Sequence, residues 1–70
     1  MNTLEIFAER LRELRIDKDL SLKQLSDRIG VSDIAISRWE NKLRTPNIEY
    51  LALLAKFFGV SADYLIGLEN

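Results

Sequence analysis

The three residues Gly30, Val31 and Ser32 separate two short helical segments, and this brief connection constrains the fold more than any other feature. The first segment opens at Ser21, which forms a capping box with Gln24, and closes at Gly30, the residue type favoured for a left-handed helix end. Ser32 then caps the next segment, which ends near Asn41. So short a turn containing glycine makes the two helices cross sharply, with the geometry of a helix-turn-helix.

The rest of the chain also carries a helical pattern. Leu4, Phe7, Leu11 and Leu14 form one stripe over residues 4–18, and Thr3 is expected to cap that helix. Further helices are expected from the cap Asn47 to Gly59 and from the cap Ser61 to Gly67. The side chains expected to point inward from the fourth helix are Ile48, Leu51, Leu54, Ala55 and Phe58. Residues 42–46 form a loop that ends at Pro46.

No segment alternates with a period of two for long enough to be a strand. We therefore expect an all-α fold, a compact five-helix domain spanning residues 1–70, with the helix-turn-helix as its second and third helices. The sequence has 70 residues and contains neither Cys nor His. Hydrophobic packing must therefore hold the fold, since no disulfide or Cys-ligated metal can.

The same composition argues against several functions. Without His or Cys, and without a glycine-rich phosphate loop or converging carboxylates, we expect no enzyme, no cofactor and no metal. No apolar run approaches the roughly 20 residues of a membrane span, and no signal peptide precedes the first helix. A cytoplasmic protein that does not bind membranes is the expectation.

Charge is distributed unevenly along a chain whose net charge is only −1. Residues 21–45 contain five basic and three acidic side chains, whereas residues 46–70 contain one basic and three acidic. This pattern indicates a positive face in the middle of the chain on a nearly neutral body, which is a weak sign of nucleic-acid binding.

The third expected helix, residues 32–41, has a chemically distinctive outward face. Ile36 and Trp39 are placed in the core by their spacing. The outward side chains are then Asp33, Ile34, Ser37 and Arg38. A helix fits the width of the DNA major groove, and the second helix of such a pair is the one that enters it. An exposed Ile34 beside Arg38 is unusual for a merely solvated surface.

These segments together resemble the lambda-repressor-like Cro/CI (XRE) helix-turn-helix family. The resemblance is carried by LRELR at residues 11–15, LSLKQLSDRIGVSDIAISRWEN at 20–41, RTP at 44–46 and LALLAKFFGVSADYLIG at 51–67. It implies a bacterial or phage transcriptional regulator, in the first instance a repressor. Such a regulator binds a double-stranded DNA operator as a homodimer, on two-fold symmetric half-sites in the bacterial nucleoid.

The resemblance also assigns roles to individual residues. Base or near-base contacts are expected from Ser32, Asp33, Ile34, Ser37 and Arg38. Phosphate contacts are expected from Ser21, from the backbone N–H groups at the start of the second helix, Leu22 included, and from Asn41, Lys42 and Arg44. Arg15 and Glu40 correspond to a pair that bridges the first helix to the end of the third.

Several roles remain open at this level. Asp33 either stabilises the start of its helix through the helix dipole or accepts a hydrogen bond from a cytosine amino group. Ser37 is either a small spacer or a residue that contacts DNA. Ile34 either contacts a thymine methyl group or is a partner-facing or plain surface residue. Three departures from the family pattern are Leu22 for Gln, Ser26 for Ala, and Lys42 for Gly, where a left-handed backbone would be strained.

Apolar side chains near the C-terminus suggest a dimer surface. We expect it at the end of the fourth helix and in the fifth, around residues 58–68. The reason is that so short a helix cannot bury all the apolar area of Tyr64, Leu65, Ile66 and Leu68 in its own core. The alternative function is the binding of a protein partner by the same fold, as in antitoxin-like proteins that pair with a toxin.

Overall fold

The computed structural model describes residues 1–69 and contains five helices in that range, with no strand. This architecture confirms the all-helical expectation. The helices are α1 (Thr3–Asp17), α2 (Leu22–Ile29), α3 (Asp33–Glu40), α4 (Ile48–Phe58) and α5 (Ala62–Ile66).

Each helix begins after a polar side chain that accepts a hydrogen bond from a backbone N–H in the first turn. The caps are Asn2, Ser21, Ser32, Asn47 and Ser61. The prediction of Thr3 as the first cap is wrong by one residue. Asn2 accepts from the Glu5 N–H at 2.9 Å, while the Glu5 carboxylate accepts from the Asn2 N–H at 3.2 Å. This reciprocal pair fixes the start of α1 at Thr3.

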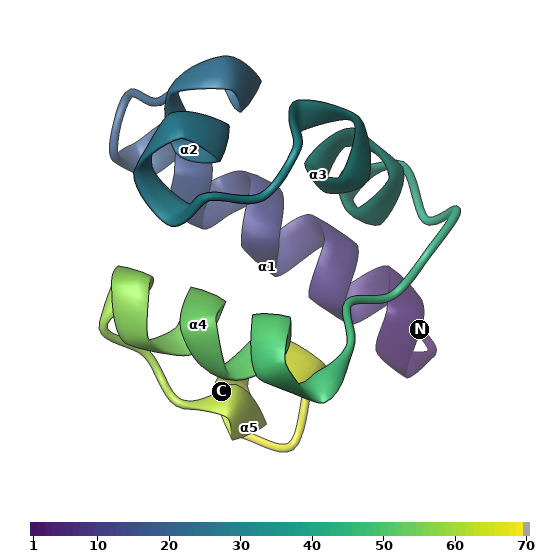
Figure 1. Ribbon diagram of the computed structural model, residues 1–70. Coiled ribbons are helices and arrows are strands. Elements are labelled where there is room, and N and C mark those ends of the chain that lie inside the picture. Colours follow the sequence, from purple (N-terminus) through teal and green to yellow (C-terminus); the bar gives the residue numbers. More distant parts are fainter. Residues whose placement is uncertain (70) are drawn as a thin grey trace.

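The helices α2 and α3 lie side by side on one flank of α1, while α4 and α5 occupy the other (Figure 1). Helix α1 packs against both α3 and α5, and α4 packs against α2 and α5. Every helix contributes at least one fully buried large side chain to the shared core. These side chains are Phe7, Leu11, Leu25, Ile36, Leu54 and Leu65.

Trp39 is buried, which confirms its assignment to the core. Its ring meets Phe7 of α1 edge-on at 6.5 Å between centroids and Tyr50 of α4 at 5.9 Å. Aromatic pairs in this range stabilise beyond the area they bury. Trp39 therefore connects α3 to α1 and to α4.

Two residues depart from the predicted burial. Ile48, expected inside, is 81% exposed. It is the first residue of α4, and because Cα–Cβ bonds tilt toward the helix N-terminus, its side chain points past the end of the helix. Leu65, expected to contribute to an exposed surface, is fully buried. The short α5 folds back onto α1 and so hides this side chain in the domain's own core.

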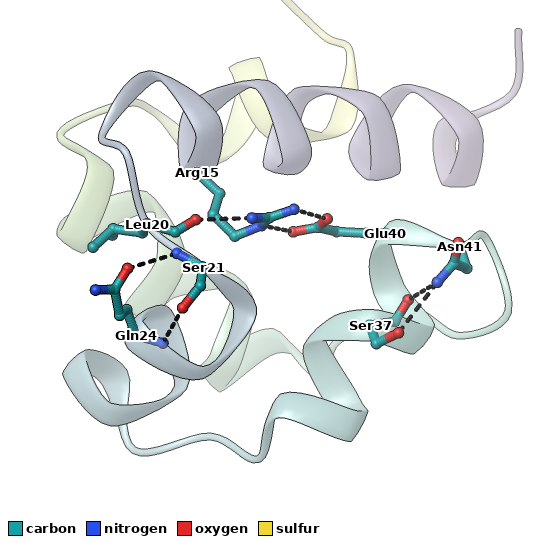
Figure 2. Close-up of polar contacts among 7 residues, drawn as sticks. All are labelled: Arg15, Leu20, Ser21, Gln24, Ser37, Glu40 and Asn41. Atoms are coloured by element: carbon teal, nitrogen blue, oxygen red, sulfur yellow. Dashed lines mark hydrogen bonds and ion pairs between the residues drawn. The ribbon is translucent and has the colours of Figure 1, made fainter.

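Arg15 and Glu40 join α1 to the end of α3 through a two-pronged ion pair (Figure 2). Arg15 Nε donates to Glu40 Oε2 at 2.6 Å, and Arg15 Nη2 donates to Glu40 Oε1 at 2.9 Å. Arg15 Nη1 also donates to the Leu20 carbonyl at 2.8 Å. The two side chains are only 13% and 5% exposed, so the predicted buried pair is confirmed.

The pair also affects the charge state of its arginine. Hydrogen bonding to Glu40 raises the pKa of the Arg15 guanidinium, although desolvation acts in the opposite direction. A raised folded-state pKa gives a cation stabilisation that is fully present below its unfolded pKa and is lost only above it. The arginine therefore remains charged throughout the ordinary pH range, and its contribution to the stability of the folded state stays constant there.

Arg15→Ala should lower the free energy of unfolding by about 3–5 kcal/mol, because the Glu40 carboxylate would be left buried without its partner. Chemical denaturation monitored by Trp39 fluorescence measures this change. Arg12→Ala is the matched control, since Arg12 is exposed on the same helix and should cost no more than about 0.5 kcal/mol. Equal stability of the two variants would contradict the structural role of the pair.

Candidate nucleic-acid interface

The turn between α2 and α3 determines which side of α3 faces outward. Gly30 ends α2 in the left-handed region with φ 71°, a conformation that other residues adopt only with strain. Two residues later, Ser32 accepts the Ala35 N–H at 3.1 Å and starts α3. Ile36 and Trp39 then face the core, so the opposite side of this eight-residue helix faces outward.

The outward face of α3 brings four of the five predicted base-contact residues around one shallow hollow. Asp33, Ile34, Ser37 and Arg38 line it together with Leu22 from the first turn of α2. Ile34 is 60% exposed, and Asp33 and Arg38 are exposed as well. Ser32 lies outside the hollow and acts as the cap of α3.

Ser37 and Asn41 interact with each other on the exposed side of α3 (Figure 2). Asn41 Nδ2 donates to the Ser37 carbonyl at 2.8 Å and to Ser37 Oγ at 3.2 Å. Both acceptors belong to Ser37, and the Asn41 side-chain oxygen can only accept. Since phosphate oxygens accept hydrogen bonds, any donation from the Asn41 side chain to a phosphate would come from the same Nδ2 group that donates to Ser37.

The N-terminus of α2 presents hydrogen-bond donors that suit an anion. Ser21 Oγ accepts the Gln24 N–H at 3.0 Å, and the Gln24 side chain accepts the Ser21 N–H at 2.8 Å. The Ser21 hydroxyl hydrogen is still available, and the N–H groups of the first helical residues, including Leu22, have no partner within the helix. These donors and the helix dipole favour a phosphate at this position.

Basic side chains continue from α3 into the following loop. A second hollow, between α3 and the start of α4, is lined on its polar side by Arg38, Arg44, Asn47 and Tyr50. Arg38 thus borders both hollows. The ion pairs within residues 1–69 are Arg15–Glu40 and an exposed Lys23–Asp27 contact at 3.8 Å, so neither Arg38, Lys42 nor Arg44 is neutralised by a carboxylate there.

Asn47 and Tyr50 were not singled out from the sequence as part of this surface. Asn47 was assigned only the capping of α4, which it performs by accepting the Tyr50 N–H at 2.8 Å. Their place beside Arg44 depends on the fold of the loop that carries Pro46. The only sequence signal was the position of a polar aromatic residue one turn after a cap.

Lys42 adopts the left-handed conformation, with φ 65°. The expectation of strain at this position, where the family pattern has Gly, is therefore correct. Conformations of this kind cost non-glycine residues on the order of 1–2 kcal/mol. The side chain is nevertheless exposed and lies directly after the end of α3.

A sequence model of the helix-turn-helix family matches residues 11–65, which include α2, α3, the basic loop and α4. The chain belongs to the helix-turn-helix family. This membership confirms the resemblance inferred from the sequence, and it places the sharp turn at Gly30 and the exposed face of α3 within a known architecture.

Named relatives of this helix-turn-helix chain are regulators. It is 43% identical over 64 residues to the HTH-type transcriptional activator BcrR of Enterococcus faecalis, and 43% identical over 68 residues to repressor protein C2 of Salmonella phage P22. It is also 38% identical over 62 residues to the regulator AnsR of Bacillus subtilis. The matches cover 91%, 94% and 89% of this chain but only 31%, 30% and 53% of the respective relatives.

The helix-turn-helix fold also matches a solved structure, that of the hypothetical transcription factor NHTF from Neisseria. The TM-score is 0.84, with 23% identity over 93% of this chain and 75% of the other. This likeness concerns the fold.

In the described part of the chain, no helix is long and apolar enough to cross a membrane.

Lys42→Gly should raise the free energy of unfolding by about 0.5–1 kcal/mol, because relief of the left-handed strain exceeds the added flexibility of the unfolded chain. Lys42→Ala removes the same charge without relieving the strain, so it should not stabilise. Thermal melts of the two variants side by side measure the difference. A stabilisation of equal size in both would assign the effect to charge and not to the backbone.

Proposed function

We propose that this protein is a sequence-specific double-stranded DNA-binding regulator of transcription that inserts α3 into the major groove. The observation that carries the proposal is the outward face of α3, where Arg38 and Ile34 stand exposed together and Arg38 has no acidic partner within residues 1–69. Family membership and the names of the relatives support the same conclusion.

The contacts divide into two groups. Asp33, Ile34, Ser37 and Arg38 face base edges, and Ser32 adds a contact at the start of α3. Ser21, the Leu22 N–H, Lys42 and Arg44 hold phosphates on either side, and Asn41 joins them through its Nδ2 group. Phosphate contacts set the position of the protein on the duplex, whereas base contacts select the sequence.

A regulator of this kind acts as a homodimer on two-fold symmetric half-sites, in the bacterial cytoplasm at the nucleoid. We place the dimer surface at the end of α4, in α5 and just after it, where Leu68 is 73% exposed. Leu65 is buried in the core and does not take part, and Tyr64 is covered on one face by Arg10, which lies 4.3 Å from its ring centroid. Dimers place one reading helix in each of two successive turns of the groove.

We propose repression as the regulatory outcome, because a protein seated on an operator excludes other proteins from the same DNA. Repressor protein C2 and the cryptic-phage repressor RstR of Vibrio cholerae carry that function in their names, whereas BcrR is named an activator. A reporter gene placed behind the selected operator distinguishes the two directions.

The substitutions Arg38→Ala and Arg44→Ala should weaken DNA binding in different ways. Loss of Arg38 should weaken binding to the preferred duplex by about 1–3 kcal/mol and relax the preference at one base position. Loss of Arg44 should weaken all sequences about equally and reduce the slope of log affinity against log salt by about one unit. The measurement is fluorescence anisotropy with matched and mismatched duplexes across a salt series.

Two outcomes would change the proposal. A uniform loss of affinity in Arg38→Ala would show that α3 does not read bases in this orientation. If neither substitution changed DNA binding, and the protein instead co-purified with a larger protein, the alternative role of holding a protein partner would replace DNA recognition.

Footprinting on the selected operator should reveal two protected half-sites whose centres lie about 34 Å apart, one helical turn of DNA. Leu68→Arg should lower the affinity for the full operator while leaving binding to an isolated half-site unchanged. Ile16→Arg, at an exposed apolar position of α1, serves as the control. Protection of one half-site with no symmetry would contradict the dimer.

A further inference from the structure

The hollow beside α3 is lined by both apolar and polar side chains. Leu22 from α2 and Ile34 from α3 provide the apolar part of its wall, although they lie twelve positions apart in the sequence. Asp33, Ser37 and Arg38 provide an acceptor, a hydroxyl and a cationic donor. A ligand that fits must therefore present an apolar group next to groups that form hydrogen bonds.

Both apolar side chains are held in place before any ligand arrives. Leu22 is half-buried and packs against the core cluster, so α2 fixes its position. Ile34 is 60% exposed, but it is β-branched, and such side chains have one strongly preferred χ1 rotamer in a helix. The wall thus needs little ordering on binding, and it remains exposed to water until a partner covers it.

The DNA major groove offers one apolar group at the base edges, the methyl group on C5 of thymine. The remaining groups there are hydrogen-bond donors and acceptors. Cytosine lacks this methyl group unless it is methylated at C5, and it presents an N4 amino donor where thymine presents the O4 acceptor. The mixed walls of the hollow therefore match the methyl group of a pyrimidine lying beside the polar edges of neighbouring bases.

We propose that Leu22 and Ile34 together form a pocket for a pyrimidine C5-methyl group, which makes the first residue of α2 a determinant of sequence preference. The inference rests on the proposed binding of DNA by α3 and goes beyond it in two ways. It assigns a base-reading role to a helix outside the reading helix. It also makes the methyl group, and not only the base identity, the feature recognised.

The test removes or adds only the methyl group. On the duplex obtained by selection from random-sequence DNA, each thymine is replaced in turn by deoxyuridine. At one position in each half-site, removal should weaken binding by about fourfold, the factor expected for leaving one methyl-sized apolar group unburied. At that position, 5-methylcytosine should bind more tightly than cytosine by a similar factor.

The protein variants connect this effect to the pocket. Ile34→Ala should bind the thymine and deoxyuridine duplexes equally. Leu22→Gln, which keeps a side chain of similar length but ends it in an amide, should shrink the difference to less than about twofold. Ile16→Ala is the matched control, because Ile16 is an exposed isoleucine on α1 and its loss should leave the fourfold difference intact. Melting temperatures of all variants establish that they are folded.

The outcomes separate the pocket from DNA binding itself. Wild-type protein that prefers one operator but binds every deoxyuridine duplex as tightly as the thymine duplex would overturn the pocket while leaving the proposed function in place. A difference that persists unchanged in Ile34→Ala would also overturn it, as would a methyl effect confined to thymine and absent from cytosine. Wild-type protein with no preference among duplexes would overturn the proposed function, and the pocket with it.

Discussion

The structure depends on a single small core to which every helix must contribute. Leu11, Leu25, Ile36, Leu54 and Leu65 come from five different helices, and each is 0% exposed. Isolated helices shorter than about 12–15 residues are marginal in water, and α2 and α3 have eight residues each. Helix α3 therefore exists because Ile36 and Trp39 are packed against other helices. The stability of the domain and the DNA recognition proposed for α3 share this origin.

The Arg15–Glu40 pair has a different role from the apolar core. A buried ion pair adds little net stability over an apolar replacement, but removal of one partner is costly. Its geometry is directional, since two guanidinium nitrogens must meet two carboxylate oxygens. The pair thereby fixes the end of α3 relative to α1, one residue before Asn41 and two before Lys42. It holds the start of the basic loop at a defined distance from the reading face.

The DNA recognition proposed for this surface would combine a rigid part and an adaptable part. The apolar wall of Leu22 and Ile34 is set by helix packing and rotamer preference, and the phosphate donors at the start of α2 are set by the cap at Ser21. Asn41 is the adaptable element, because its exposed Nδ2 group donates to Ser37 and is also the donor that a phosphate would use.

The sequence by itself determined the features that arise from neighbours three or four residues apart. Four of the five caps and the left-handed end of α2 were predictable, because capping hydrogen bonds and φ preferences act within one turn. The strained backbone at Lys42 was predictable only because the family pattern has Gly there. Asn2 was missed by one residue because Thr3 is also a good cap and both fit the local pattern. The Arg15–Glu40 pair was predictable only through the family resemblance.

Tertiary structure decided which side chains meet and which are left uncovered. Periodicity placed Ile48 on the inner stripe of α4, and the excess of apolar side chains near the C-terminus placed Leu65 in a dimer surface. Burial depends on what lies opposite a side chain, which no local pattern records. The same holds for the hollow that joins Leu22 to Ile34 and for the one that sets Asn47 and Tyr50 beside Arg44. These convergences require helices to cross at particular angles, and the packing of the whole core sets those angles.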